Sequence, residues 1–207
     1  NRMYQTHNNQ YVTVYANIGG VEYSKEILIE PVIFDDMDHP LSVYFAVSSM
    51  NSYKKYSERY QSSNELFSDG FKNTFNMLYY AFGSPNSDGT IDINDTYMSE
   101  VLKLKNYGVR ILFVIDGANS GSLKNLVQVC NDATLRKTFV NNIYNLIVKY
   151  NLDGVDIDWE FPGLSGVNGY TTEIDIANMN ALVKELREKF SVEQDEPGTE
   201  YLITAAT

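Results

Sequence analysis

The sequence is poor in the residues that usually hold disulfides and metals. Its 207 residues include one cysteine, Cys130, and two histidines, His7 and His39. A single cysteine excludes an internal disulfide framework, and we expect it to pack in a helix. Without a cluster of cysteines and histidines, we expect no zinc site and no other bound metal.

Basic residues and long apolar runs are also scarce. Lysine and arginine together number 16 against 27 aspartates and glutamates, a net charge of -11. Nucleic acid and anionic membrane surfaces need a basic face, so we expect neither as a partner. No apolar run approaches the roughly 20 residues of a membrane helix. The sequence has no initiator methionine and no signal-peptide pattern, so we expect it to begin inside a longer protein.

The first 33 residues are typical of a β-hairpin. Alternating segments at 11–16 and 22–30 flank a turn at Gly19 and Gly20. A lone hairpin is marginally stable in water, so we predict that residues 1–33 are the last strands of an immunoglobulin-like or fibronectin-like module. The alternative is a cover over the floor of the next domain. The acidic residues 34–41 then indicate a linker.

From residue 42 onward, apolar segments typical of strands alternate with helical patterns. This rhythm predicts parallel βαβ units, which fit a doubly wound sheet and a barrel equally well. We expect strands at 42–48, 76–83, 109–115, within 152–163, and at 201–205, and helices at 64–74, 95–105, 133–150 and 172–190. Asp132 is expected to cap the third of these helices, and Thr172 and Asp175 to form a capping pair for the fourth.

The most informative segment is Asp153-Gly154-Val155-Asp156-Ile157-Asp158-Trp159-Glu160. Side chains alternate across a strand, so Asp156, Asp158 and Glu160 share one face and Trp159 lies on the other. The pattern could also belong to an exposed edge strand with its acids in water. Such a strand would be expected to carry basic residues between the acids, and this segment has none. Helical patterns on both sides instead indicate a covered parallel strand with acids facing inward, a costly arrangement unless the acids share protons or do chemistry.

This segment resembles the DGxDxDWE signature of the glycoside hydrolase family 18 chitinases, with every fixed position present. Tyr80-Ala81-Phe82 is similar to a strand of the same family. The resemblance implies a (β/α)8 TIM barrel, of which residues 42–207 contain about five of eight strands. Such a barrel needs roughly 250 residues. We therefore expect the front part of a catalytic barrel.

The resemblance also implies a mechanism without a cofactor. Glu160, nearest the mouth of the barrel, would be the general acid and base. The substrate's own 2-acetamido oxygen would attack the anomeric carbon, with retention of configuration. Asp158 would orient the acetamido N–H, and the deeper Asp156 would share a proton with Asp158. Phe82 and Tyr80 are expected to line the substrate cleft.

One segment departs from the family pattern. Where the family's third strand usually ends in Ser-x-Gly-Gly, this sequence has Val114-Ile115-Asp116-Gly117. Val114 cannot donate the hydrogen bond that the serine gives to the deep aspartate. Asp116 is interpreted as a loop cap, with a sugar contact or an alignment slip as alternatives.

We therefore expect a secreted or cell-surface hydrolase of β-1,4-linked N-acetylglucosamine polymers, with such polysaccharides or oligosaccharides as its partners. Two alternatives remain. An endo-β-N-acetylglucosaminidase on N-glycans would fit the altered third strand, although that branch usually lacks the tryptophan found at Trp159. A non-catalytic glycan-binding protein would usually lose the acid that this sequence keeps at Glu160.

Overall fold

A computed structural model gives the structure of most of the chain. It describes residues 10–18, 20–29, 41–49, 67, 75–163, 172–192 and 201–206. The chain divides into two compact units, residues 1–39 and residues 40–207. Apart from Leu41 and Phe67, the expected linker at 34–41 and the expected helix at 64–74 lie outside the described residues.

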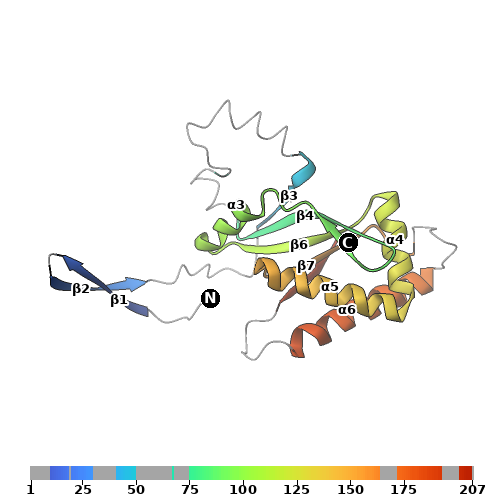
Figure 1. The fold of residues 1–207 in the computed structure, drawn as a ribbon. Helices are drawn as coiled ribbons and strands as arrows, with labels where there is room; N and C mark the ends of the chain where they lie inside the picture. Colours follow the sequence, from blue (N-terminus) through green and yellow to red (C-terminus); the bar gives the residue numbers. More distant parts are fainter. Residues whose placement is uncertain are drawn as a thin grey trace. The chain divides into compact units, whose positions relative to one another are not determined.

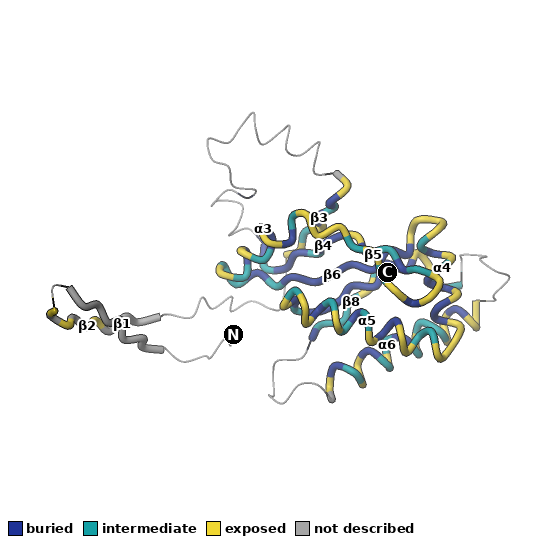
Figure 2. Tube along the Cα trace, viewed as in Figure 1, coloured by how far each residue is buried: buried dark blue, intermediate teal, exposed yellow. Residues whose placement is uncertain are grey.

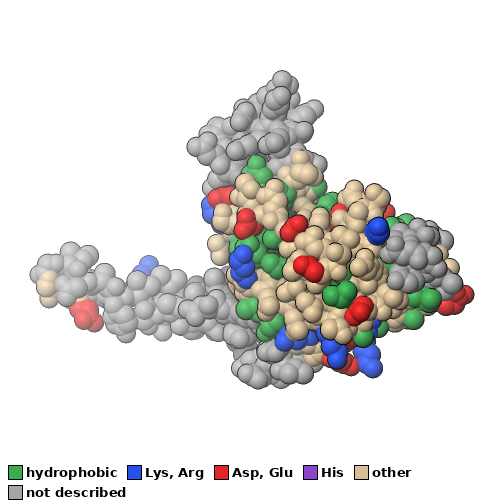
Figure 3. Space-filling model, turned by 45° about the vertical axis from the view of Figure 1, so that its right-hand side comes forward, with side chains coloured by type: hydrophobic (Ala, Val, Ile, Leu, Met, Phe, Trp, Pro, Cys, Tyr) green, Lys and Arg blue, Asp and Glu red, His purple; other side chains and the backbone are tan. Residues whose placement is uncertain are grey.

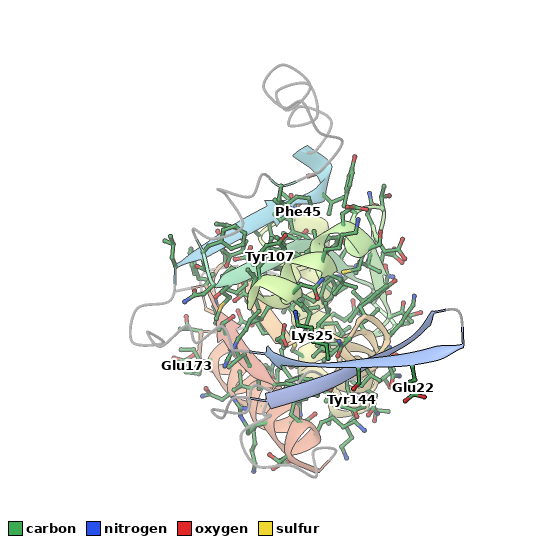
Figure 4. The ribbon with its side chains drawn as sticks, turned by 90° about the vertical axis from the view of Figure 1, so that its left-hand side faces the viewer. Glu22, Lys25, Phe45, Tyr107, Tyr144 and Glu173 are labelled. Atoms are coloured by element: carbon green, nitrogen blue, oxygen red, sulfur yellow. The ribbon has the colours of Figure 1, made fainter. Side chains whose placement is uncertain are left out.

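The first unit contains the expected β-hairpin. Strands β1 (Gln10–Ile18) and β2 (Val21–Ile29) pair antiparallel, with Ile18 opposite Val21 across a two-residue turn. Glu22 and Lys25 are exposed on β2 (Figure 4). The assignment of this hairpin to an immunoglobulin-like or fibronectin-like module stays a prediction.

The second unit is built on a parallel sheet (Figure 1). Its five parallel strands are β3 (Ser42–Ala46), β4 (Met77–Pro85), β6 (Arg110–Gly117), β7 (Gly154–Trp159) and β8 (Leu202–Ala205). Each lies beside the one before it in the sequence. A doubly wound sheet reverses its strand order at a switch point, and these strands do not. The order therefore agrees with the first strands of a barrel.

Short β5 (Ile91–Ile93), which the sequence pattern did not predict, pairs antiparallel with the end of β4. The described helical segments are η1 (Val47–Ser49), α3 (Met98–Leu102), η2 (Lys103–Tyr107), α4 (Ser120–Asn131), α5 (Ala133–Tyr150) and α6 (Thr172–Val192). Asp132 caps α5 as predicted, because its carboxylate accepts from the Thr134 and Leu135 N–H groups. Helix α4, which contains the buried Cys130, was not predicted as a separate element.

The two faces of the sheet have different surroundings. One face packs on the helices and carries the main hydrophobic core, which includes Phe45, Phe113, Ile157 and Trp159. Figure 4 shows Phe45 on β3 beside the α3–η2 segment, and its ring lies 6.2 Å from that of Tyr97. Strand β6 is buried along nearly its whole length (Figure 2). The acids of β7 lie on the opposite face, because side chains alternate along a strand.

Thr172 and Asp175 contact the turn after β7, and their predicted role as a capping pair stays a prediction. The Thr172 hydroxyl donates to the Gly163 carbonyl oxygen at 3.0 Å, and the Gly163 N–H donates to the Asp175 carboxylate at 3.1 Å. Both side chains therefore bond α6 to the turn that follows β7. This contact fixes the chain just beyond Glu160.

Helices α4, α5 and α6 are joined by the Arg136 guanidinium. It donates two hydrogen bonds to Glu185 of α6, at 2.9 and 2.8 Å, and one to the Cys130 carbonyl oxygen of α4, at 2.6 Å. Both side chains of the Arg136–Glu185 ion pair are mostly buried. The desolvated Cys130 thiol beside it has a raised pKa and is held as a neutral core group.

We expect Arg136→Ala to lower the free energy of unfolding by roughly 2–4 kcal/mol, because it leaves a buried carboxylate and a buried carbonyl without their donor. Urea denaturation of the full-length protein measures this. Lys103→Ala is the control: it removes an exposed ion pair with Glu100 and should cost less than about 0.5 kcal/mol. Equal losses in the two variants would contradict the role given to Arg136.

Candidate active site

The three acids of the motif lie at increasing depth from the end of β7. Asp156 is 1% exposed and Asp158 is 6% exposed, while Glu160 directly follows the strand and is exposed. Trp159 lies on the other face, in the core against the helices, as predicted. The alternation of the strand therefore gives a solvent-accessible carboxyl group above two buried ones.

Asp156 is held by two hydroxyl groups from distant strands. The Tyr44 hydroxyl of β3 donates to one carboxylate oxygen at 2.8 Å, and the Thr204 hydroxyl of β8 donates to the other at 2.5 Å. Desolvation, followed by the hydrogen bond to Asp156, raises the pKa of Tyr44, so it remains a donor. Val114 lies directly beside Asp156 in the sheet. Val114 has no hydroxyl group to donate to Asp156, and hydroxyl groups from β3 and β8 supply these hydrogen bonds instead.

Asp158 lies between Asp156 and Glu160 in the row of acids on this face. Its pKa is raised to about 6, chiefly by burial and then by the charges of Glu160 and Asp156, with Asp116 as a smaller cause. Both Asp156 oxygens accept from hydroxyl donors. The expected sharing of a proton between Asp156 and Asp158 stays a prediction.

A fourth carboxylate, Asp116, completes the group. It lies on β6 directly beside Asp158 and is 3% exposed. Its oxygens accept hydrogen bonds from the Ala118 N–H at 3.1 Å, the Asn119 N–H at 3.2 Å and the Asn119 side-chain amide at 2.7 Å. The interpretation of Asp116 as a loop cap is confirmed by these contacts. Its proximity to Asp158 was not predicted.

Asp153 at the foot of β7 has a structural position. Its carboxylate accepts from the Ile111 N–H at 2.7 Å and from the Lys105 ammonium at 2.7 Å. These bonds fix the start of β7 against β6. They contribute to the site by setting the register in which Asp116 meets Asp158.

Of the two aromatic residues predicted to line the cleft, Tyr80 does not. It is 1% exposed, packs with Phe45 in the core on the helix side, and donates its hydroxyl hydrogen bond to the Asn94 carbonyl oxygen at 2.7 Å. Burial raises the pKa of Tyr80 to about 12. A register shift in β4 between Tyr80 and Gly83 breaks the simple alternation that put both aromatics on one face. Phe82, at the end of β4, is 37% exposed and remains a candidate for substrate contact.

Sequence reasoning did not identify Tyr44 or Thr204, which fix Asp156, or Tyr79, whose ring centroid lies 4.6 Å from that of Tyr44. The only sequence signal for them was their place in predicted strands. Within the described residues, no helix has the length and apolar character needed to cross a membrane, and no group of acids, histidines or cysteines is arranged to hold a metal ion. On the face shown in Figure 3, acidic side chains are scattered, and several basic side chains gather along the lower edge.

Several known proteins are similar to parts of this chain. The chain is 36% identical over 112 residues to the killer toxin subunits alpha/beta of Kluyveromyces lactis, covering 52% of this chain and 10% of that protein. It is 36% identical over 81 residues to chitinase A1 of Niallia circulans, which covers 39% of this chain and 12% of that protein. It is 31% identical over 120 residues to mouse chitotriosidase-1, which covers 56% of this chain and 25% of that protein. The chain thus spans a quarter or less of the length of these relatives.

Solved structures agree on the fold. A family 18 chitinase from Cycas revoluta, in complex with (GlcNAc)3, superposes with a TM-score of 0.63 at 21% identity, over 82% of this chain and 46% of that one. A group IV chitinase from Ostrinia furnacalis gives 0.61 at 24% identity, over 82% and 44%. Residues 44–207 match the family described as Glycosyl hydrolases family 18. Since this match covers most of the sequence, the chain belongs to glycosyl hydrolase family 18.

Proposed function

We propose that the protein of which this chain is part hydrolyses β-1,4-linked N-acetylglucosamine in chitin or chitooligosaccharides, with retention of configuration. The observation that carries the proposal is the row of acids on β7, in which Asp156 and Asp158 are buried and Glu160 is exposed at the end of the strand. A proton held at the mouth of the site is what cleavage of a glycosidic bond requires. The five parallel strands are proposed to be the first part of a (β/α)8 barrel.

Glu160 donates its proton to the glycosidic oxygen, and the bond between that oxygen and the anomeric carbon breaks. The substrate's acetamido carbonyl oxygen attacks the anomeric carbon from the other side and forms an oxazolinium ion, as in other substrate-assisted enzymes. Asp158 accepts a hydrogen bond from the acetamido N–H and offsets the positive charge. Water then attacks the anomeric carbon, Glu160 takes its proton, and the acetamido group is restored.

Asp156 has a positioning role in this scheme. Because its two oxygens accept from Tyr44 and Thr204, its carboxylate stays fixed below Asp158. Its negative charge is one of the causes that raise the pKa of Asp158. Phe82 offers an exposed ring near the end of β4, suited to stacking on a sugar.

The test compares substrates that differ only at the acetamido group. The full-length protein should cleave an N-acetylglucosamine oligomer and leave a fully deacetylated glucosamine oligomer uncut, because the latter lacks the nucleophile. A thiazoline analogue of the oxazolinium ion should inhibit. Efficient cleavage of the deacetylated oligomer, or a trapped ester between sugar and enzyme, would refute the substrate-assisted mechanism.

A parallel assay with an N-glycan separates the alternative substrate. Release of the glycan with no cleavage of chitooligosaccharides would assign the site to N-glycan hydrolysis. Binding of either glycan with no cleavage would assign it to recognition alone. Chitin is an extracellular polymer, so we propose a secreted or cell-surface location for the whole protein.

A further inference from the structure

Asp116 is a buried carboxylate that the proposed reaction does not use. It points to the same face of the sheet as Asp158, because the two residues are paired across β6 and β7. Neighbouring strands lie about 4.8 Å apart. The Asp116 charge is thus fixed a short distance from Asp158, in a region that is almost fully buried.

The partners of Asp116 hold it as an acceptor. Both its oxygens receive N–H donors from Ala118 and Asn119, and the three hydrogen bonds close the loop between β6 and α4. These contacts hold the Asp116 carboxylate in one position, beside Asp158 on the neighbouring strand.

We propose that Asp116 is a positioning residue for the reaction: its buried carboxylate, beside Asp158 in the sheet, favours retention of a proton on the neighbouring carboxyl groups of Asp158 and Glu160, so that the general acid stays protonated to a higher pH than a neutral residue at this position would allow. The expected effect on turnover rests on the proposed function. The effect of the Asp116 charge on the protonation of Asp158 does not depend on that function.

The other groups around Asp158 determine in which direction its pKa changes when the Asp116 charge is removed. Asp156 lies below it on β7, Glu160 follows it, Asp116 lies beside it on β6, and the Tyr44 hydroxyl approaches from β3. The three carboxyl groups raise the pKa of Asp158, and the Tyr44 hydroxyl is neutral at ordinary pH because its own pKa is raised. Removal of one negative charge beside Asp158 therefore favours loss of the proton at lower pH, and both limbs of the pH–activity curve move to lower pH.

The experiment measures kcat/KM for a chitooligosaccharide from pH 4 to 9 in the full-length protein and in Asp116→Asn. Asparagine keeps an acceptor oxygen for the loop N–H groups but has no charge. Both limbs should move to lower pH by about 0.5 to 1 unit. A uniform loss of activity without this shift would show that Asp116 only shapes the loop, and would overturn the proposal.

Two further measurements distinguish a failure of this proposal from a failure of the proposed function. Carbon-13 NMR titration of the aspartate carboxyl groups reads the apparent pKa of Asp158 without turnover. A downward shift in an inactive protein would refute the proposed function and support the charge effect, while an unchanged titration would refute the charge effect. If Asp116→Asn does not fold, Asp116→Ser serves, since its hydroxyl can accept from the same N–H groups.

The matched control is Asp88→Asn. Asp88 is an exposed aspartate between β4 and β5 that accepts from the Thr90 N–H two residues on, at 2.9 Å, as Asp116 accepts from Ala118. The Asp88→Asn variant loses one negative charge from the same kind of turn, away from Asp116, Asp156, Asp158 and Glu160. Its pH–activity curve should coincide with that of the unmodified protein; an equal shift in this variant would attribute the effect to net charge and overturn the proposal for Asp116.

Discussion

Replacing Glu160 with glutamine is expected to reduce turnover of a chitooligosaccharide by roughly 10²–10⁴-fold, the usual contribution of a general acid. Glutamine keeps the shape of the side chain and can still accept a hydrogen bond, but it has no proton to give to the leaving oxygen. Because Glu160 is exposed at the end of β7, the substitution leaves the core intact. The dissociation constant for the oligosaccharide should change little.

Steady-state kinetics and calorimetric titration on the full-length protein measure the two effects. Glu188→Gln, which changes an exposed glutamate on α6 in the same way, should leave both turnover and binding unchanged. Near-normal turnover in Glu160→Gln would remove this residue from the acid role. A parallel loss of binding would indicate that Glu160 mainly holds the sugar.

The second large effect is expected from Gly154→Ala, at the start of β7. A Cβ atom there would lie 2.2 Å from the Leu202 carbonyl oxygen and 2.7 Å from the Leu202 nitrogen. Both are backbone atoms of the paired strand, so they cannot move aside as the end of a side chain could. We expect a loss of about 3 kcal/mol or more in the free energy of unfolding.

Gly154→Ala should also disturb the acids of the candidate site. Separation of β8 from β7 would withdraw the Thr204 hydroxyl from Asp156, because Thr204 lies on β8 directly beside Asp156. Thermal and urea denaturation measure the stability, and activity at a temperature where the variant is folded measures the second effect. Gly121→Ala is the control, since a Cβ on Gly121 of α4 meets nothing within 4 Å. Equal stability of the two variants would contradict the close approach at Gly154.

Local patterns in the sequence were sufficient for several features of the site. Alternation along one strand placed Asp156 and Asp158 on one face and Trp159 on the other, because the side-chain period of a strand is fixed by its backbone. The cap at Asp132 depends on residues two and three positions away, so it too could be predicted. The order of the motif along β7 predicted that Glu160 would be the accessible acid.

Other features depend on strand order and register, which no local pattern contains. Tyr44 reaches Asp156 across 112 residues of sequence and Thr204 reaches it across 48, so their roles exist only once β3, β7 and β8 are in place. The register of β6 against β7 sets Asp116 beside Asp158, and the register shift in β4 leaves Tyr80 in the helix-side core. The sequence by itself determined which acids could do chemistry. Tertiary structure decided which neighbours hold them and which charges surround them, because hydrogen bonds and charge interactions depend on distances in space that pairing between remote strands creates.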